Sequence, residues 1–388
     1  MKRAFLLLVL GAFCFAACTP ETNPAKDTEL TGTTVDVSGL GVKADKLFVL
    51  NEGGLGANNA TLDFLRFSDG LYVTGSFKKM NPEVGAGLGD VGNDIAVNGD
   101  EVWMVINNSG IVEVVSAKNE TEIVAVSVPT PRNIAFDGKY AYVTSWAGAY
   151  ATYTYDSGTG YSTITASANP KGQVYRINLK TKKIEGTVEV GYQPEGIAVY
   201  KGKIYVANSG GISSQLAPNY AYDNTVSIID AKTFQVEKTV EVQVNLKSVF
   251  SDGKGMIYVT TLGNYYDVHS GLYMIDVTKP DTPVKVADYV SVAAVSGDTV
   301  YCIGAENEFD WSAAKTWTAW GCKKGEKTSM TLSVNATSLY SLFAVDGDTF
   351  FVGDAGDYFN PGTVTCYDKG QKLWTVNAGV CPGHFAIW

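Results

Sequence analysis

The sequence predicts an all-β protein, a seven-bladed β-propeller, and two observations carry this prediction. A phrase made of an apolar strand, a Gly-containing turn and a second apolar strand recurs along the 388 residues, at 95–105, 134–143, 197–206, 249–259, 293–302 and 342–352. A seventh copy, at 384–388, holds only the first strand, and the matching second strand lies near the other end of the chain, at 46–50. Repeats of about 40–50 residues are typical of propeller blades, and an array split in this way can close as a ring.

The other two strands of each blade follow the phrase. In the unit that begins at residue 197, the stretches 225–230 and 236–242 alternate apolar and polar residues with a period of two, as half-buried strands do. Seven units of four strands account for residues 45–388, with Ala386 pairing into the blade that the N-terminal part begins. The small residues Ala96, Ala135 and Ala198 suit the crowded axis. No stretch after the N-terminal segment shows an apolar period typical of a helix.

Residues 1–17 are predicted to be a lipoprotein signal peptide. Lys2 and Arg3 precede an apolar segment, 4–17, that is too short to span a membrane. It ends in Phe15-Ala-Ala-Cys18, which resembles the lipobox of bacterial lipoproteins, in which the cysteine becomes diacylated. Residues 18–44 are expected to be the lipidated Cys18 and a flexible tether, because they are rich in Thr, Pro, Glu and Lys without an apolar pattern. An ordinary cleaved secretory signal is the alternative.

The net charge and the cysteine content of the chain limit the binding partners and the disulfides that are expected. The formal net charge is −10, and about −12 once Lys2 and Arg3 are removed, which disfavours nucleic acid and anionic membrane surfaces. Besides Cys14 and Cys18, the cysteines are Cys302, Cys322, Cys366 and Cys381. A cross-strand disulfide between Cys302 and Cys322, on the second and third strands of one blade, and buried free thiols both stay open.

The sequence contains no recognisable catalytic motif. It has two histidines, His269 and His384, and neither belongs to a spaced metal-ligand motif. No nucleophile elbow, phosphate loop or dinucleotide fingerprint stands between a strand and a helix. Loop acids such as Asp354 and Asp357 are expected to be solvated rather than to bind Ca²⁺. The prediction is therefore a protein without catalytic residues, metal or cofactor, that is, not an enzyme.

The long insertions are expected to form a binding face. They join the second and third strands of successive blades, at 146–172, 208–224, 262–269, 304–311 and 353–361, and they are rich in Tyr, Trp, Asn and Gly. Such residues give a large contact area with hydrogen-bonding edges, which suits a large, rigid, uncharged ligand. The predicted walls of the site are Trp146, Tyr150, Tyr155, Tyr220, Tyr222, Tyr265, Tyr266, Trp311, Tyr358 and Phe359. The predicted polar contacts are Arg132, Asn133, Asn208, Asn224 and His384.

Several phrases carry a resemblance to a known family. Ile204-Tyr-Val-Ala-Asn208 and the stretches 193–199 and 224–230 resemble YVTN-type β-propeller repeats, and 47–62 looks like the Bacteroidetes lipoprotein branch of that group. Members similar to this chain are the BtuG-type surface lipoproteins. The resemblance implies capture of cobalamin (vitamin B12), as a ligand and not a cofactor, and its transfer to a TonB-dependent outer-membrane transporter. It also implies an outer-membrane lipoprotein that is anchored by lipid and exposed at the cell surface, with the periplasmic leaflet as the alternative.

Other functions stay open at this point. The same aromatic face would suit a glycan- or peptide-binding lipoprotein, and a transporter-associated scaffold would bind no small molecule. Some propellers of related repeat type are lactonases or quinoprotein dehydrogenases, a reading that the scarcity of histidines disfavours. Ligation of cobalt by His384 or His269, and a plain hydrogen-bonding or packing role for both, are likewise open.

Overall fold

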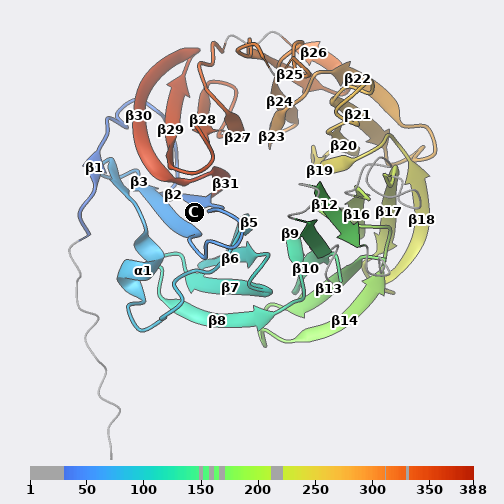
Figure 1. Cartoon of the computed structure of the whole chain (residues 1–388), viewed down its shortest axis with the longest axis horizontal. Coiled ribbons are helices and arrows are strands. Elements are labelled where there is room, and N and C mark those ends of the chain that lie inside the picture. The colour runs from blue at the N-terminus through green and yellow to red at the C-terminus, as the bar shows by residue number, and fades with distance from the viewer. Residues whose placement is uncertain are drawn as a thin grey trace, which may run out of the picture. The chain divides into compact units, whose positions relative to one another are not determined.

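The structure is a computed structural model that describes residues 30–147, 152–156, 161–165, 171–210, 222–310, 312–328 and 332–388, with only the backbone described for 152–156 and 161–165. Residues 31–388 form one compact unit. In this unit the described strands make seven antiparallel sheets arranged as blades around an axis (Figure 1). The predicted seven-bladed β-propeller is therefore confirmed.

The first three blades are listed here from the axis outward. Blade 1 holds β31 (Pro382–Ile387), β2 (Lys46–Asn51), β3 (Thr61–Arg66), β4 (Leu71–Val73) and a fifth strand, β1 (Thr33–Thr34). Blade 2 holds β5 (Gly92–Asn98), β6 (Glu101–Ile106), β7 (Ile111–Ser116) and β8 (Glu122–Ser127). Blade 3 holds β9 (Pro131–Asp137), β10 (Tyr140–Ser145), β13 (Gln173–Asn178) and β14 (Ile184–Glu189).

The remaining four blades follow the same order. Blade 4 holds β15 (Pro194–Tyr200), β16 (Lys203–Asn208), β17 (Thr225–Asp230) and β18 (Gln235–Glu241). Blade 5 holds β19 (Leu246–Ser251), β20 (Met256–Thr261), β21 (Gly271–Asp276) and β22 (Val284–Asp288). Blade 6 holds β23 (Val292–Ser296), β24 (Thr299–Gly304), β25 (Thr318–Lys323) and β26 (Glu326–Thr328). Blade 7 holds β27 (Leu339–Ala344), β28 (Thr349–Asp354), β29 (Pro361–Asp368) and β30 (Gln371–Val380).

Blade 1 closes the ring with strands from both ends of the chain. The C-terminal strand β31 pairs antiparallel with β2, with Ala386 opposite Phe48, as the split repeat predicts. Trp388 extends the pairing, since its carbonyl accepts from the Lys46 amide at 3.1 Å and its amide donates to the Lys46 carbonyl at 2.9 Å. The Lys46 ammonium also forms a buried ion pair with Glu120 in blade 2, at 2.6 Å. The ring is therefore closed by a ladder of backbone hydrogen bonds within blade 1 and by an ion pair that joins blade 1 to blade 2.

The core lies between neighbouring blades, where the second strands are almost entirely buried. Aromatic side chains cross from one blade to the next: Trp103 meets Phe136 edge to face with ring centroids 5.7 Å apart, and Tyr301 meets Phe350 at 5.1 Å. Such pairs stabilise beyond the area they bury. The phrase in the sequence is thus the part of each blade that packs against its neighbours.

Two kinds of glycine are required by this geometry. Gly99 and Gly138 turn the first two strands of blades 2 and 3 with φ of 61° and 57°, the left-handed region that glycine adopts readily. Gly196, at the start of β15, lies against β19, and a Cβ there would stand 2.6 Å from Ser248 Cα. Glycine at 196 therefore lets the inner strands of blades 4 and 5 approach closely.

Three local features differ from the sequence-based expectations. Residues 33–40, assigned to the tether, lie on blade 1, because β1 pairs with β4 and Leu40 is buried in the core. The insertion of blade 3 contains a hairpin of β11 (Thr152–Asp156) and β12 (Tyr161–Thr165). A helix of five residues, α1 (Ser76–Met80), packs on β3 through the buried Phe77. None of the helices in the described part of the chain is long and apolar enough to cross a membrane.

The four cysteines of the propeller are buried and free of disulfides. Cys302 on β24 lies opposite Trp320, and Cys322 on β25 lies opposite Val300, so the two thiols are diagonal neighbours. Burial raises the pKa of Cys366 to about 12 and that of Cys381 to about 11. Of the two alternatives from the sequence, the structure has the buried thiols.

Candidate functional site

A cavity of about 700 Å³ follows the propeller axis, and the inner region of every blade contributes to its wall. We call it the axial channel. The residues that immediately precede or begin the inner strands line it, among them Asp94, Arg132, Glu195, Lys247 and His384. Asp94, Arg132, Glu195 and Lys247 stand one or two residues before the apolar phrase of their repeats, and His384 begins the last copy. The propeller therefore gathers charged residues from five blades at one end of the inner strands.

Arg132 and Glu195 form an ion pair across blades 3 and 4. The Arg132 Nε donates to Glu195 Oε2 at 2.9 Å, with the two side chains 18% and 15% exposed. The Arg132 guanidinium also lies over the Trp146 indole, 4.4 Å from its centroid. Burial raises the pKa of Glu195, against the lowering effects of Arg132, Lys247 and the Trp146 indole. This is a fixed, partly enclosed cation–aromatic–anion cluster.

Glu52, Tyr340 and His384 form a second cluster across blades 1 and 7. The Tyr340 hydroxyl donates to Glu52 Oε2 at 2.5 Å, and His384 Nε2 lies 3.2 Å from Glu52 Oε1. Burial alone would raise the pKa of Glu52, but the contacts with His384 and Tyr340 leave it lowered. His384 Nδ1 lies 3.9 Å from Asp94 Oδ1. The histidine therefore stands between two carboxylates.

Asp94 is held mainly by backbone. Its two carboxylate oxygens each accept an amide, from Ile95 and from Ile134, both at 2.9 Å. Burial raises its pKa, while His384, the Ile134 amide and the Asn133 side chain act against that rise. Asp94 thus ties blade 2 to blade 3 and leaves little of its hydrogen-bonding capacity for a ligand.

Lys247 is a cation of the channel wall that has no ion-pair partner among the described residues. It lies directly before Ser248 at the start of the inner strand of blade 5, and its side chain is exposed to the channel that it lines. The shortage of bulk water inside the channel lowers the pKa of Lys247, and Arg132 adds to that effect, while Glu52 and Glu195 act against it. Among the described residues, no hydrogen bond or ion pair of its ammonium is found, so its three donors are available.

Four aromatic residues of the insertion loops form what we call the rim: Trp146, Tyr222, Tyr265 and Tyr358. Of these, Trp146 and Tyr358 contact residues that line the channel. Trp146 covers Arg132 as described, and Tyr358 meets Tyr340 edge to face at 5.9 Å. Burial raises the pKa of Tyr265, with Asn245 lowering it and Tyr222 and Glu195 raising it further. The rim therefore meets the channel wall at Trp146 on blade 3 and at Tyr358 on blade 7, while Tyr265 is linked to Asn245, the neighbour of the lining residue Leu246.

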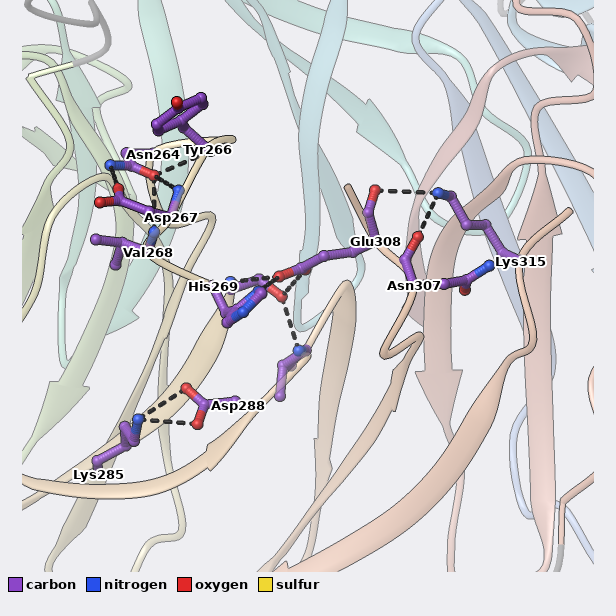
Figure 2. A network of polar contacts seen from close by, with 12 residues as sticks. Asn264, Tyr266, Asp267, Val268, His269, Lys285, Asp288, Asn307, Glu308 and Lys315 are labelled. Carbon is purple, nitrogen blue, oxygen red and sulfur yellow. Dashed lines mark hydrogen bonds and ion pairs between the residues drawn. The ribbon is translucent and has the colours of Figure 1, made fainter. Parts of the chain in front are cut away.

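The rim loops are held in fixed conformations. Tyr265 and Tyr358 have φ of 60° and 68°, which is uncommon for bulky residues. The Asn264 side chain accepts the amides of Tyr266, Asp267 and Val268 at 2.9–3.0 Å (Figure 2). Asp357 accepts the amides of Phe359 and Asn360 in the same manner. Tyr266 and Phe359 remain 76% and 86% exposed beside the rim.

His269 has a different role from His384. Its Nδ1 lies 2.8 Å from Glu308 Oε1, and Glu308 also accepts the Ser270 hydroxyl at 2.5 Å (Figure 2). The imidazole stacks on Phe309 with centroids 5.0 Å apart. Blade 5 is joined to the loop of blade 6 by these contacts, so His269 is a packing and hydrogen-bonding residue in this structure.

The predicted site residues divide into four groups. Arg132, Asn133 and His384 line the axial channel, and Trp146, Tyr222, Tyr265, Tyr266, Tyr358 and Phe359 lie at or beside the rim. Asn208 is fully buried and donates to Thr225 and Ser227 at 3.0 Å, which makes it structural, and Asn224 directly precedes β17. Tyr150, Tyr220, Trp311 and Cys18 lie outside the described residues, as does the side chain of Tyr155 on β11.

The sequence-based prediction missed the channel residues Glu52, Asp94, Glu195, Lys247 and Tyr340. A signal for most of them was present, because four of the five stand one or two places before the recurring apolar phrase. An alignment of the seven copies extended backward by two residues would have shown a column of polar and aromatic side chains. Metal ligation is not indicated in the described part of the chain, where no group of three or more His, Cys, Asp or Glu side chains is suited to hold an ion.

Together these features define a seven-bladed β-propeller with a polar axial channel and an aromatic rim. No family model and no curated protein matches the chain in sequence. Among solved structures, hydrazine synthase of Kuenenia stuttgartiensis is similar, with a TM-score of 0.56, 14% identity and coverage of 76% of this chain and 88% of that one. A functionally unknown protein from Desulfotomaculum acetoxidans has a TM-score of 0.60 and 12% identity over 89% of this chain and 99% of its own. These similarities establish the fold.

Proposed function

We propose that this protein is a non-enzymatic, ligand-capturing lipoprotein that binds cobalamin or a related corrinoid at the rim of its axial channel. The observation that carries the proposal is the direct contact between rim aromatics and channel polar groups: Trp146 with Arg132, and Tyr358 with Tyr340. A corrin has a broad, flat, apolar face and a periphery of amides. The aromatics would cover the face, while the channel side chains would meet the amides.

Preorganisation supports capture rather than turnover. The loops of Tyr265 and Tyr358 are held by the Asn264 and Asp357 turns, so less conformational entropy is lost when a ligand binds. The channel carboxylates are committed to Arg132, His384, Tyr340 and backbone amides rather than standing free as an acid/base pair. Hydrazine synthase is similar in structure at 14% identity, and a similarity at that level bears on the fold alone.

The resemblance of the repeat phrases to YVTN-type lipoproteins supplies the rest of the proposal. Lipidation of Cys18 would hold the propeller at the outer membrane, facing the cell surface, and a TonB-dependent transporter would receive the ligand. A purified membrane fraction tests the anchor: the wild-type chain should sediment with membranes, and Cys18→Ser should be released. Release of both, or retention of both, would remove the lipoprotein part of the proposal.

Titration of the purified chain lacking residues 1–18 with cyanocobalamin, by calorimetry and absorbance, tests the ligand. We expect one-to-one binding, with a loss of at least tenfold in Trp146→Ala and in Tyr265→Ala, because stacked aromatics contribute about 1–3 kcal/mol each. Leu373→Ala is the matched control, since it removes a side chain that is 47% exposed on the outer strand β30. Absence of heat and of retained colour would overturn the corrinoid proposal, and binding of a glycan array instead would identify a glycan receptor.

A further inference from the structure

We propose that the axial channel is a binding site in its own right, in which Lys247 holds the carboxylate of a small ligand that has an apolar body. This inference does not rest on cobalamin capture. It concerns the channel below the rim, and it starts from an ammonium group in the described channel wall that makes no hydrogen bond or ion pair with another described residue.

The carboxylates of the wall are already committed. Glu195 accepts from Arg132 at 2.9 Å, and Glu52 accepts from Tyr340 at 2.5 Å. Asp94 accepts from two backbone amides at 2.9 Å. In contrast, the Lys247 ammonium is exposed to the channel and makes no hydrogen bond or ion pair with any described residue. A ligand that enters therefore finds donors at Lys247, and the group that complements an ammonium is a carboxylate or a similar anion.

The channel wall next to Lys247 is neutral and largely apolar. Blades 6 and 7 contribute Val292, Ala294, Leu339 and Leu342 to the lining, together with the hydroxyls of Ser291 and Ser341. Lys247, on blade 5, stands at the border between this neutral arc and the charged arc of blades 1–4. A ligand with its anionic group at Lys247 can therefore place an apolar body against blades 6 and 7 without meeting a charge.

The dimensions agree with a small ligand. A cavity of about 700 Å³ lies in the range of roughly 300–1,000 Å³ that is usual for small-molecule sites. Burial lowers the pKa of Lys247, and a bound anion would raise it again. Binding is therefore expected to take up a fraction of a proton at alkaline pH and to weaken as the pH rises.

Benzoate is a suitable probe, with benzamide as its uncharged counterpart of nearly the same shape. We expect the purified propeller to bind benzoate at least tenfold more tightly than benzamide by calorimetry, and more weakly at pH 10 than at pH 7. Lys247→Met should reduce benzoate binding at least tenfold, and Lys247→Arg should retain it within about threefold because the positive charge is kept. Lys254→Met is the matched control, since Lys254 is 60% exposed and paired with Asp298 at the β23–β24 turn.

The possible results of this experiment distinguish the proposal from its alternatives. Equal binding of benzoate and benzamide, no binding at millimolar concentration, or unchanged benzoate affinity in a folded Lys247→Met would each overturn the proposal and leave Lys247 as a counter-charge for Glu52 and Glu195. Thermal unfolding of each variant shows whether it is folded. Cobalamin binding is measured separately, so the corrinoid proposal can fail while the benzoate result stands, and the reverse.

Discussion

Glu52 in the wall of the axial channel and Glu113 in the interior of blade 2 are both enclosed, but their pKa values shift in opposite directions. In the channel, Glu52 and Glu195 each have a cationic or hydroxyl partner. In blade 2, Glu113 on β7 is 4% exposed, and its Oε1 has no hydrogen-bond partner among the described residues. Burial, reinforced by the nearby Glu122, raises the pKa of Glu113 to about 8, whereas the pKa of Glu52 is lowered.

The difference shows that burial alone does not decide the charge state in this protein. Glu52, which meets His384 and Tyr340, has a lowered pKa, whereas the pKa values of Glu195 and Asp94 stay raised although their partners act against the effect of burial. Glu113 has no cation beside it, and its pKa of about 8 favours the protonated form at neutral pH. Partners from neighbouring blades therefore oppose the effect of burial at the channel carboxylates, and perturbed groups that line a cavity mark a candidate binding site.

The largest expected effect on stability comes from breaking the ion pair between Arg132 and Glu195 in the channel. Arg132→Met should lower the free energy of unfolding by about 3 kcal/mol, because Glu195 is left in the wall without its cation. Removal of the cation raises the folded-state pKa of Glu195 further, so the deficit should grow as the pH rises from 5 to 8. Urea unfolding at both pH values measures it.

A second substitution provides the control for that experiment. Arg132→Met combined with Glu195→Gln should recover most of the lost stability, because no charge is then left unpaired. If the double variant is as unstable as Arg132→Met alone, the loss of stability comes from packing around Trp146. The unpaired charge of Glu195 would then not be its cause, and the contrast drawn between the channel and blade 2 would be wrong for the channel.

A smaller effect, of opposite sign, is expected in blade 2. Glu113→Gln should stabilise the protein at pH 8.5 by about 2 kcal/mol and leave it unchanged near pH 4.5. The sign follows from the raised pKa of Glu113, about 8: the folded state binds the proton more tightly than the unfolded state, so wild-type stability falls as the pH rises from about 4.5 to about 8. Thermal unfolding across this range, with the exposed Glu83→Gln as control, measures it. A gain that is the same at both pH values would contradict the assignment.

The smallest effect is expected on the outer surface. Lys238 and Asp281 join blades 4 and 5 with Nζ and Oδ2 2.5 Å apart, but the two side chains are 36% and 69% exposed. Lys238→Met should change the free energy of unfolding by no more than about 0.5 kcal/mol, and 1 M salt should abolish even that difference. A loss of stability comparable to that of Arg132→Met would contradict this explanation. It would mean that enclosure in the channel is not the reason why the Arg132–Glu195 ion pair contributes more to the free energy of unfolding.

The fold could be predicted because patterns within short segments of the sequence specify it. The turn glycines Gly99 and Gly138 and the apolar phrases around them specify strand, turn and strand within about ten residues. The half phrase at 384–388 and its complement at 46–50 specify closure, which the pairing of β31 with β2 confirms. The short α1 and the hairpin of β11 and β12 were missed because they lie in insertions outside the repeated frame.

The candidate site could be predicted only in part. The aromatic loops were singled out because their composition is unusual, and Trp146 and Tyr358 contact residues that line the channel. Asn208 was chosen for a binding role from its place in the chain, but its amide is used inside blade 4. Composition identifies a residue suited to binding, while it does not show which hydrogen bonds the fold already uses.

What the sequence determined by itself is the architecture: seven units, their strand order and the ring closure, since these depend on periods and turns that extend over a few residues. What only the tertiary structure decided is the chemistry at the axis. Glu52, Asp94, Glu195, Lys247 and His384 are spread over 333 positions of the chain, and they meet only when the ring closes. Their charge states and the unpaired donors of Lys247 depend on distances between blades, which local sequence patterns do not encode.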